Sequence, residues 1–203
     1  MIYTFGCSLT YGQWLEDNTK DNQDLGFPSK FAWPGVLSKQ LKQPVTNIST
    51  PGASNKEIWH NIVTTKFTPT DTVIILWTHF DRWCVIDNDD YIRLHPRMAP
   101  SDLRDAYYGF IHNSNDIRLD FLVRVNHVKQ YLDNLGVTNY HFHASESQLS
   151  TATSEWSTVQ FEKPTMSALR IAYPHELALD DKHPGNKIHE LFAEQVIYAV
   201  NKY

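Results

Sequence analysis

The sequence has only two cysteines, Cys7 and Cys84, among its 203 residues. Two cysteines cannot form the disulfide framework of a small secreted domain, so we expect a reducing or redox-indifferent setting. No apolar run approaches the roughly 20 residues that a membrane helix needs. The first residues also lack the basic segment and the apolar stretch of a secretion signal. We therefore expect a soluble, cytoplasmic protein that makes no membrane contact.

The sequence also has fewer basic than acidic residues. The chain has 18 Lys and Arg residues against 23 Asp and Glu residues, which gives a net charge of -5. The sequence contains no dense run of Lys and Arg, and we therefore expect no nucleic-acid partner. With 41% hydrophobic and 20% charged residues, the composition is that of a folded chain, and the length suits one domain with a full core. The oligomeric state is left open.

Apolar runs alternate with amphipathic segments, a pattern typical of a parallel sheet covered by helices. Strands are expected at residues 2–5, 45–48, 72–77 and 137–143, with a further short one near 167–173. Helices are expected to begin near Trp33 and Ser54, to span 119–135 and to begin again at Pro184. The sequence thus predicts the α/β class: a single three-layer α/β/α sandwich of four or five parallel strands.

Residues 79–116 separate two of these elements and are rich in Asp, Pro, Arg and aromatic residues. We interpret them as an insertion of loops and short helices. Aromatic residues alternate there with basic ones, a mixture suited to stacking on sugar rings or holding an acidic group. It is equally consistent with a small core of the insertion itself. The residues concerned are Trp83, Tyr91, Tyr107, Tyr108 and Phe110, with Arg82, Arg93, His95, Arg97 and Arg104.

Ligand sites in open α/β sheets form outside the carboxyl ends of the strands. Ser8 follows the first predicted strand, and its hydroxyl becomes a nucleophile only if an oriented base takes its proton. His183 is a candidate base, because the residue before a proline avoids helical geometry. Asp180, three residues earlier, can fold onto its ring and fix the tautomer. Alternatively, Ser8 and Asp180 merely cap turns or helices.

Three segments together resemble a known family. Gly6-Cys7-Ser8-Leu9 resembles the Gly-Asp-Ser-Leu block of the SGNH (GDSL-like) hydrolases, residues 47–52 resemble their second block, and Asp180-x-x-His183-Pro184 resembles their last. The resemblance implies a flavodoxin-like sandwich, serine esterase activity, and neither a metal nor an organic cofactor. It also implies Ser8 as nucleophile, His183 as base, Asp180 as orienting carboxylate, and the N–H groups of Ser8 and Gly52 as oxyanion donors.

The third family block differs. Where the family has Gly-x-Asn-Asp, this chain has Trp77-Thr78-His79-Phe80-Asp81-Arg82, so the usual Asn donor is missing. A divergent phage and bacterial subset is similar, with Gly-Cys-Ser in its first block and Trp-Thr followed by Arg in its third. Asn55, Thr78 and His79 are candidate replacements for the missing donor, and Asn55 is favoured because its amide offers the same chemistry beside Gly52. The expected substrate wall comprises Thr78, His79, Arg82 and Trp83.

The leading hypothesis is a serine esterase or acyl hydrolase that removes acyl groups such as acetyl from a carbohydrate or another small ester. One alternative is a binding module that keeps the fold but has lost turnover. A second is a metallohydrolase using His141 and His143, which alternate on one predicted strand and face the same side. Such a pair is more often structural. Cys84 is interpreted as a packing residue.

Overall fold

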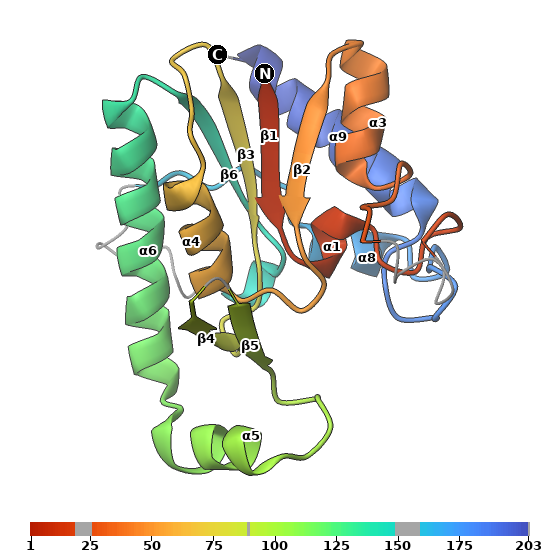
Figure 1. Cartoon of the computed structure of the whole chain (residues 1–203). Helices are drawn as coiled ribbons and strands as arrows, with labels where there is room; N and C mark the ends of the chain where they lie inside the picture. The colour runs from red at the N-terminus through yellow and green to blue at the C-terminus, as the bar shows by residue number, and fades with distance from the viewer. Residues whose placement is uncertain (19–25, 89, 149–158, 203) are drawn as a thin grey trace.

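The computed structural model describes residues 1–18, 26–88, 90–148 and 159–202. Its main sheet has four parallel strands in the order β2-β1-β3-β6 (Figure 1). The strands are β1 (Ile2–Gly6), β2 (Val45–Ser49), β3 (Thr72–Trp77) and β6 (Thr138–His143). This arrangement confirms the predicted α/β sandwich, with four strands in the described part of the chain. No described helix combines the length and apolarity of a membrane span.

Helices cover both faces of the sheet (Figure 1). α4 (Asn55–Thr64) and α6 (Ser114–Asn134) pack on one face, and α3 (Trp33–Leu41) and α9 (Asn186–Lys202) pack on the other. Coverage on both sides explains the unbroken apolar run of β3, in which Val73 to Trp77 are fully buried. Because the four strands are parallel, they all end at the same edge of the sheet, where the loops that follow them meet.

Side-chain caps set where two of the helices begin. Ser54 accepts the N–H of Glu57 at 3.3 Å, so α4 starts at Asn55, close to the predicted position. α6 starts five residues earlier than expected, because Asn113 accepts the N–H groups of Asn115 and Asp116 at 2.9 and 3.2 Å. This start shortens the insertion at its C-terminal end.

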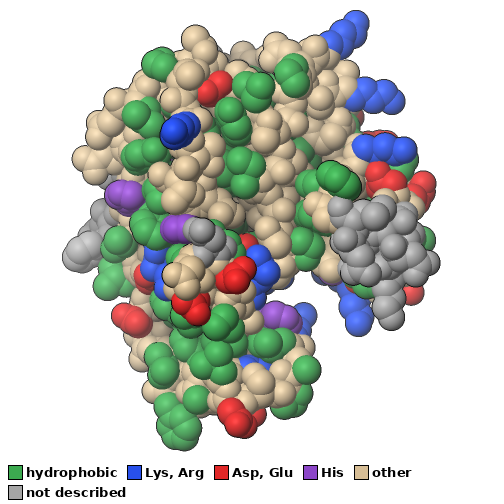
Figure 2. Space-filling view, in the orientation of Figure 1, with side chains coloured by type: hydrophobic (Ala, Val, Ile, Leu, Met, Phe, Trp, Pro, Cys, Tyr) green, Lys and Arg blue, Asp and Glu red, His purple; other side chains and the backbone are tan. Residues whose placement is uncertain are grey.

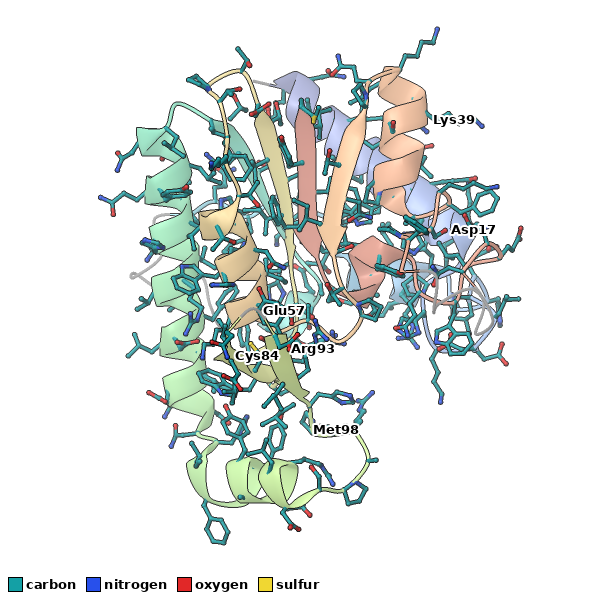
Figure 3. All side chains as sticks on the ribbon, in the orientation of Figure 1. Asp17, Lys39, Glu57, Cys84, Arg93 and Met98 are labelled. Carbon is teal, nitrogen blue, oxygen red and sulfur yellow. The ribbon has the colours of Figure 1, made fainter. Side chains whose placement is uncertain are left out.

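The insertion contains an antiparallel hairpin that the prediction of loops and short helices missed. The hairpin consists of β4 (Trp83–Asp87) and β5 (Asp90–Leu94), and α5 (Asp102–Ala106) and the π-helical turn η1 (Tyr107–Ile111) follow it. Asn88 takes the positive φ of 53° that its turn requires. Arg93 of β5 donates to both carboxylate oxygens of the buried Glu57, at 2.8 and 2.7 Å, and so ties the hairpin to α4 (Figure 3).

The prediction of a short strand near residues 167–173 is wrong, because α8 (Met166–Ala172) occupies this segment. Thr165 begins the helix by accepting the N–H of Ala168 at 3.2 Å. Met166, in the first turn, is buried against the face of the sheet that α9 covers. The tertiary contact and the cap together override the β-like run at the end of the segment.

Candidate active site

Ser8 lies at the carboxyl end of β1, in the first turn of α1 (Ser8–Tyr11). The chain turns sharply there: Cys7 is extended, and its carbonyl accepts the N–H groups of Thr10 and Tyr11, both at 2.9 Å. A Cβ on Gly6 would lie 2.0 Å from Thr10 Oγ1, so only glycine fits immediately before this turn. The short connection fixes Ser8 at the edge of the sheet where ligands bind in such folds.

Asp180 and His183 form a hydrogen-bonded pair just before α9. Asp180 Oδ2 lies 2.7 Å from His183 Nδ1, and Asp180 Oδ1 accepts the backbone N–H groups of His183 and Lys182 at 2.9 and 3.1 Å. Burial disfavours the charged carboxylate, but these bonds outweigh it and hold the pKa of Asp180 below its ordinary value. An ionised Asp180 keeps the Nδ1–H tautomer, which leaves Nε2 as a proton acceptor.

A cavity of about 460 Å³ brings Ser8 and His183 together. Its size is within the range of small-molecule sites. The described residues that line it are Ser8, Leu9, His79, Arg82, His95, Arg97, Ala144, Met166, Ser167, Arg170, Lys182, His183 and Pro184. Among the described residues, no hydrogen bond joins Ser8 Oγ to His183 Nε2. Such contacts often tighten only when a substrate is bound.

Two backbone N–H groups near the strand ends have no acceptor in the part of the chain that the structure describes. Gly52 follows β2 in a turn with a positive φ of 78°, a conformation that favours glycine. Within the described residues, the N–H groups of Ser8 and Gly52 have no hydrogen-bond acceptor. Donors of this kind can stabilise an oxygen that becomes negatively charged during a reaction.

The side chain of Asn55 is committed to the backbone of Thr78. Asn55 Nδ2 donates to Thr78 O at 3.1 Å, and Asn55 Oδ1 accepts the Thr78 N–H at 2.8 Å. The Thr78 hydroxyl in turn contacts Cys7 Sγ at 3.2 Å. Asn55 and Thr78 are buried, and neither lines the cavity. The network links the ends of β1 and β3 to the start of α4, and so holds the cavity wall in position.

The other residues of the expected substrate wall divide between two places. His79 and Arg82 line the cavity, and Arg82 Nη1 reaches the carbonyl of Ala53, next to Gly52, at 3.5 Å. Burial and the charge of Arg82 lower the pKa of His79, which hydrogen-bonds Gln148. Trp83 lies instead in a separate hollow, where its ring stacks on Tyr107 with centroids 5.7 Å apart. The insertion aromatics therefore pack partly among themselves.

His141 and His143 lie in the core. Trp77 Nε1 donates to His141 Nδ1 at 3.0 Å, and the backbone N–H of Ser145 donates to His143 Nδ1 at 3.0 Å. Burial lowers the pKa of His141 to about 3 and that of His143 to about 4. Among the described residues, no group of three or more His, Cys, Asp or Glu side chains is placed to hold a metal ion.

Cys84 is also buried, and burial raises the pKa of its thiol. It lies close to Ser54, Lys56 and Glu57 at the start of α4. Figure 3 shows it beside Glu57 and Arg93. A protonated thiol in this setting packs the hairpin against α4.

Comparisons with known proteins agree on the fold. Three solved structures are similar over almost the whole chain. A member of the lipolytic protein G-D-S-L family from Veillonella parvula has a TM-score of 0.55 and 14% identity, and covers 100% of this chain and 98% of its own. The psychrotrophic esterase EstA from Pseudoalteromonas sp. has a TM-score of 0.54 and 11% identity, with coverages of 99% and 96%. The acetyl xylan esterase AlAXEase has a TM-score of 0.56 and 10% identity, with coverages of 98% and 100%.

This chain has the fold of those lipolytic and esterase structures. At such low identities the similarity extends to the fold and no further. No protein-family model matches the sequence, and no curated protein matches it.

The sequence analysis missed two charged residues of the cavity, Arg170 and Lys182. Arg170 was overlooked because its segment was interpreted as a strand, although Thr165 followed by apolar Met166 and Leu169 is a helix-start pattern. Lys182 lies inside the segment that also carries Asp180 and His183, but a single lysine gives no sign of what it faces. Only the fold brings these residues opposite the insertion.

Proposed function

We propose that the protein is a serine ester hydrolase of the SGNH type. The observation that carries the proposal is that His183, hydrogen-bonded to Asp180, lines the same cavity as Ser8. The fold of the esterase neighbours and the three sequence blocks support the same assignment. The sequence resemblance to the phage and bacterial subset with a Gly-Cys-Ser first block belongs to this proposal as well.

In the proposed reaction, Ser8 Oγ attacks the ester carbonyl carbon while its proton passes to His183 Nε2. The C–O bond of the ester then breaks, the alcohol leaves with that proton, and the acyl group stays on Ser8. Water next gives a proton to the same ring and attacks the acyl carbon. The carboxylic acid departs as Ser8 regains its hydrogen. Asp180 stabilises the imidazolium in both halves of the reaction.

The negative oxygen of each tetrahedral intermediate needs hydrogen-bond donors. The N–H groups of Ser8 and Gly52 are two of the proposed donors. For the third we propose Arg82 in place of Asn55, because Asn55 is committed to Thr78 while Arg82 lines the cavity beside the Gly52 turn. A guanidinium is always charged and offers several N–H donors. Asn55 then acts as a positioning residue.

The substrate we propose is a small ester or an acylated carbohydrate, cleaved without a metal or an organic cofactor. The test compares the protein with its Ser8→Ala variant on nitrophenyl esters and acetylated sugars. We expect Ser8→Ala to lower the turnover number by a factor on the order of 10⁶, as seen when a triad nucleophile is removed. Circular dichroism should show an unchanged fold.

The matched control is Ser38→Ala, an exposed hydroxyl on α3 whose partner is the carbonyl of Gln43. We expect this variant to hydrolyse esters like the unmodified protein. Undiminished activity in folded Ser8→Ala would overturn the serine mechanism. A protein that binds glycans but turns over no ester would instead be a binding module.

A further inference from the structure

The charge of the cavity is opposite to that of the whole chain. The protein carries a net charge of -5, yet its cavity is lined by Arg82, Arg97, Arg170 and Lys182. No Asp or Glu is found among the described lining residues. Figure 2 shows Lys, Arg and His side chains at the opening between the insertion and the rest of the molecule. The described lining of the cavity is thus positive, although the chain as a whole is negative.

These four cations differ in their pairing from three arginines elsewhere in the protein. Arg93, Arg104 and Arg124 each form an ion pair with a carboxylate. Within the described residues, none of the four cavity cations has a carboxylate at ion-pair distance. Cations gathered in a concave site without acidic partners produce a positive potential that attracts anions.

The cations reach the cavity from two separate parts of the chain. Arg97 follows β5 in the insertion, whereas Arg170 lies at the end of α8 and Lys182 directly precedes His183. All three are exposed, so they are accessible to a ligand. Arg82 is closer to the Gly52 turn, where we have assigned it to the oxyanion. The remaining three can therefore contact another part of the same substrate.

The histidines of the insertion report the same potential. Burial lowers the pKa values of His79 and His95, and the charges of Arg82 and Arg97 lower both further. Asp81 acts in the opposite direction on both rings without reversing the shift. Arg104 adds to the effect on His95. A positive field at the two rings therefore agrees with the lining of the cavity.

We propose that the substrate is an ester carrying a carboxylate or phosphate group, which Arg97, Arg170 and Lys182 bind while Ser8 attacks the ester carbonyl. The ester part of this statement rests on the proposed function, and the anion part rests on the cavity charges. Arginine side chains suit both anions, because the planar guanidinium donates two parallel hydrogen bonds to either.

The test uses two acetate esters of equal size, 4-acetoxybenzoate and 4-acetoxybenzamide, which differ by one negative charge. Each kcat/KM is divided by the rate constant of the same ester with hydroxide, which removes the intrinsic reactivity. At low salt, we expect this corrected kcat/KM to be about tenfold or more higher for the anionic ester than for the neutral ester. The ratio of these two values should fall toward one as salt shortens the screening length from about 30 Å to about 3 Å. 4-Acetoxyphenyl phosphate distinguishes a phosphate preference from a carboxylate preference.

Arg97→Gln and Arg170→Gln should each lower the ratio several-fold, and the triple variant with Lys182→Gln should bring it near one. Lys39→Gln is the matched control, because Lys39 is an exposed lysine on α3 at the far end of the molecule (Figure 3). This control should leave the ratio unchanged. Equal hydrolysis of both esters would overturn the anion preference and leave the proposed function standing.

A binding measurement separates the two proposals if no ester is turned over. Calorimetry on the Ser8→Ala protein gives the dissociation constants of both esters without hydrolysis. Tighter binding of the anionic ester, lost in the glutamine variants, supports the anion site even when the unmodified protein is inactive. Equal binding of the two esters by an inactive protein overturns both proposals.

Discussion

Two histidine environments lie near the carboxyl edge of the same sheet, and their chemistry differs. His183 is partly exposed, lines the cavity and has an aspartate on its ring. His141 and His143 are buried among aromatic rings, among them Phe121 and Phe161, and have low pKa values. Burial opposes the charged form of His141 and His143, which makes them neutral packing groups, whereas the Asp180 carboxylate fixes the ring orientation of His183. We therefore assign the proposed proton transfer to His183 and not to the buried pair.

Removal of the carboxylate partner of His183 should have the largest effect on turnover. We expect Asp180→Asn to lower kcat by about 10⁴, because an amide neither fixes the Nδ1–H tautomer nor stabilises the imidazolium. Stopped-flow or steady-state kinetics on a neutral ester measure this loss. Asp181→Asn, at the adjacent exposed position, is the control and should retain activity. Full activity in Asp180→Asn would contradict the proposal that the Asp180 carboxylate enables proton transfer by His183.

Loss of the proposed third oxyanion donor, Arg82, should have the next largest effect on turnover. We expect Arg82→Gln to lower kcat on a neutral ester by about 10²–10³ with little change in KM. Asn55→Ala should chiefly destabilise the fold, by about 1–3 kcal/mol, since the buried N–H of Thr78 loses its acceptor. Chemical denaturation measures that loss. A larger kcat effect in Asn55→Ala than in Arg82→Gln would restore the amide as the donor.

The buried histidines should make stability depend on pH. Burial lowers the pKa values of His141 and His189 to about 3 and that of His143 to about 4. As the pH falls below about 6.5, these three histidines become protonated in the unfolded chain but stay neutral in the folded protein. The free energy of unfolding should therefore decrease between about pH 6.5 and pH 4. Urea titrations at several pH values test this, and a constant free energy over that range would contradict it.

The smallest effect concerns His141 alone. We expect His141→Phe to cost about 1–3 kcal/mol of stability, because the buried N–H of Trp77 loses its acceptor. Activity on esters should persist, and EDTA should not change it. A double-mutant cycle with Trp77→Phe isolates the hydrogen bond from the change in packing. Loss of activity in EDTA that zinc restores would revive the metal hypothesis.

Much of the fold follows from local sequence, and the departures have physical causes. The residue 72–77 strand was predicted because a strand buried on both faces is apolar throughout. The hairpin at Trp83–Asp87 and Asp90–Leu94 was missed because its strands are short and partly exposed. α8 was missed because its cap at Thr165 is a weaker signal than the β-like residues near its end.

In the candidate site, too, some features could be predicted from the sequence and others could not. The Asp180–His183 contact was predictable, because three residues separate the two in one short segment, whereas the catalytic roles of Ser8, Asp180 and His183 stay a prediction. The positive cavity was not predictable, because Arg97 and Arg170 are far apart in the sequence and meet only through the fold. Asn55 was predicted as a donor because the sequence does not show that Thr78 occupies its amide.

The most direct test of the account is to map where a serine-directed phosphonate reacts. The protein is treated with a nitrophenyl phosphonate, and intact mass and peptide sequencing locate the adduct. We expect one adduct per chain, on Ser8, and much slower adduct formation in His183→Ala. An adduct on another residue, or ester hydrolysis that continues in a protein fully modified at Ser8, would contradict it.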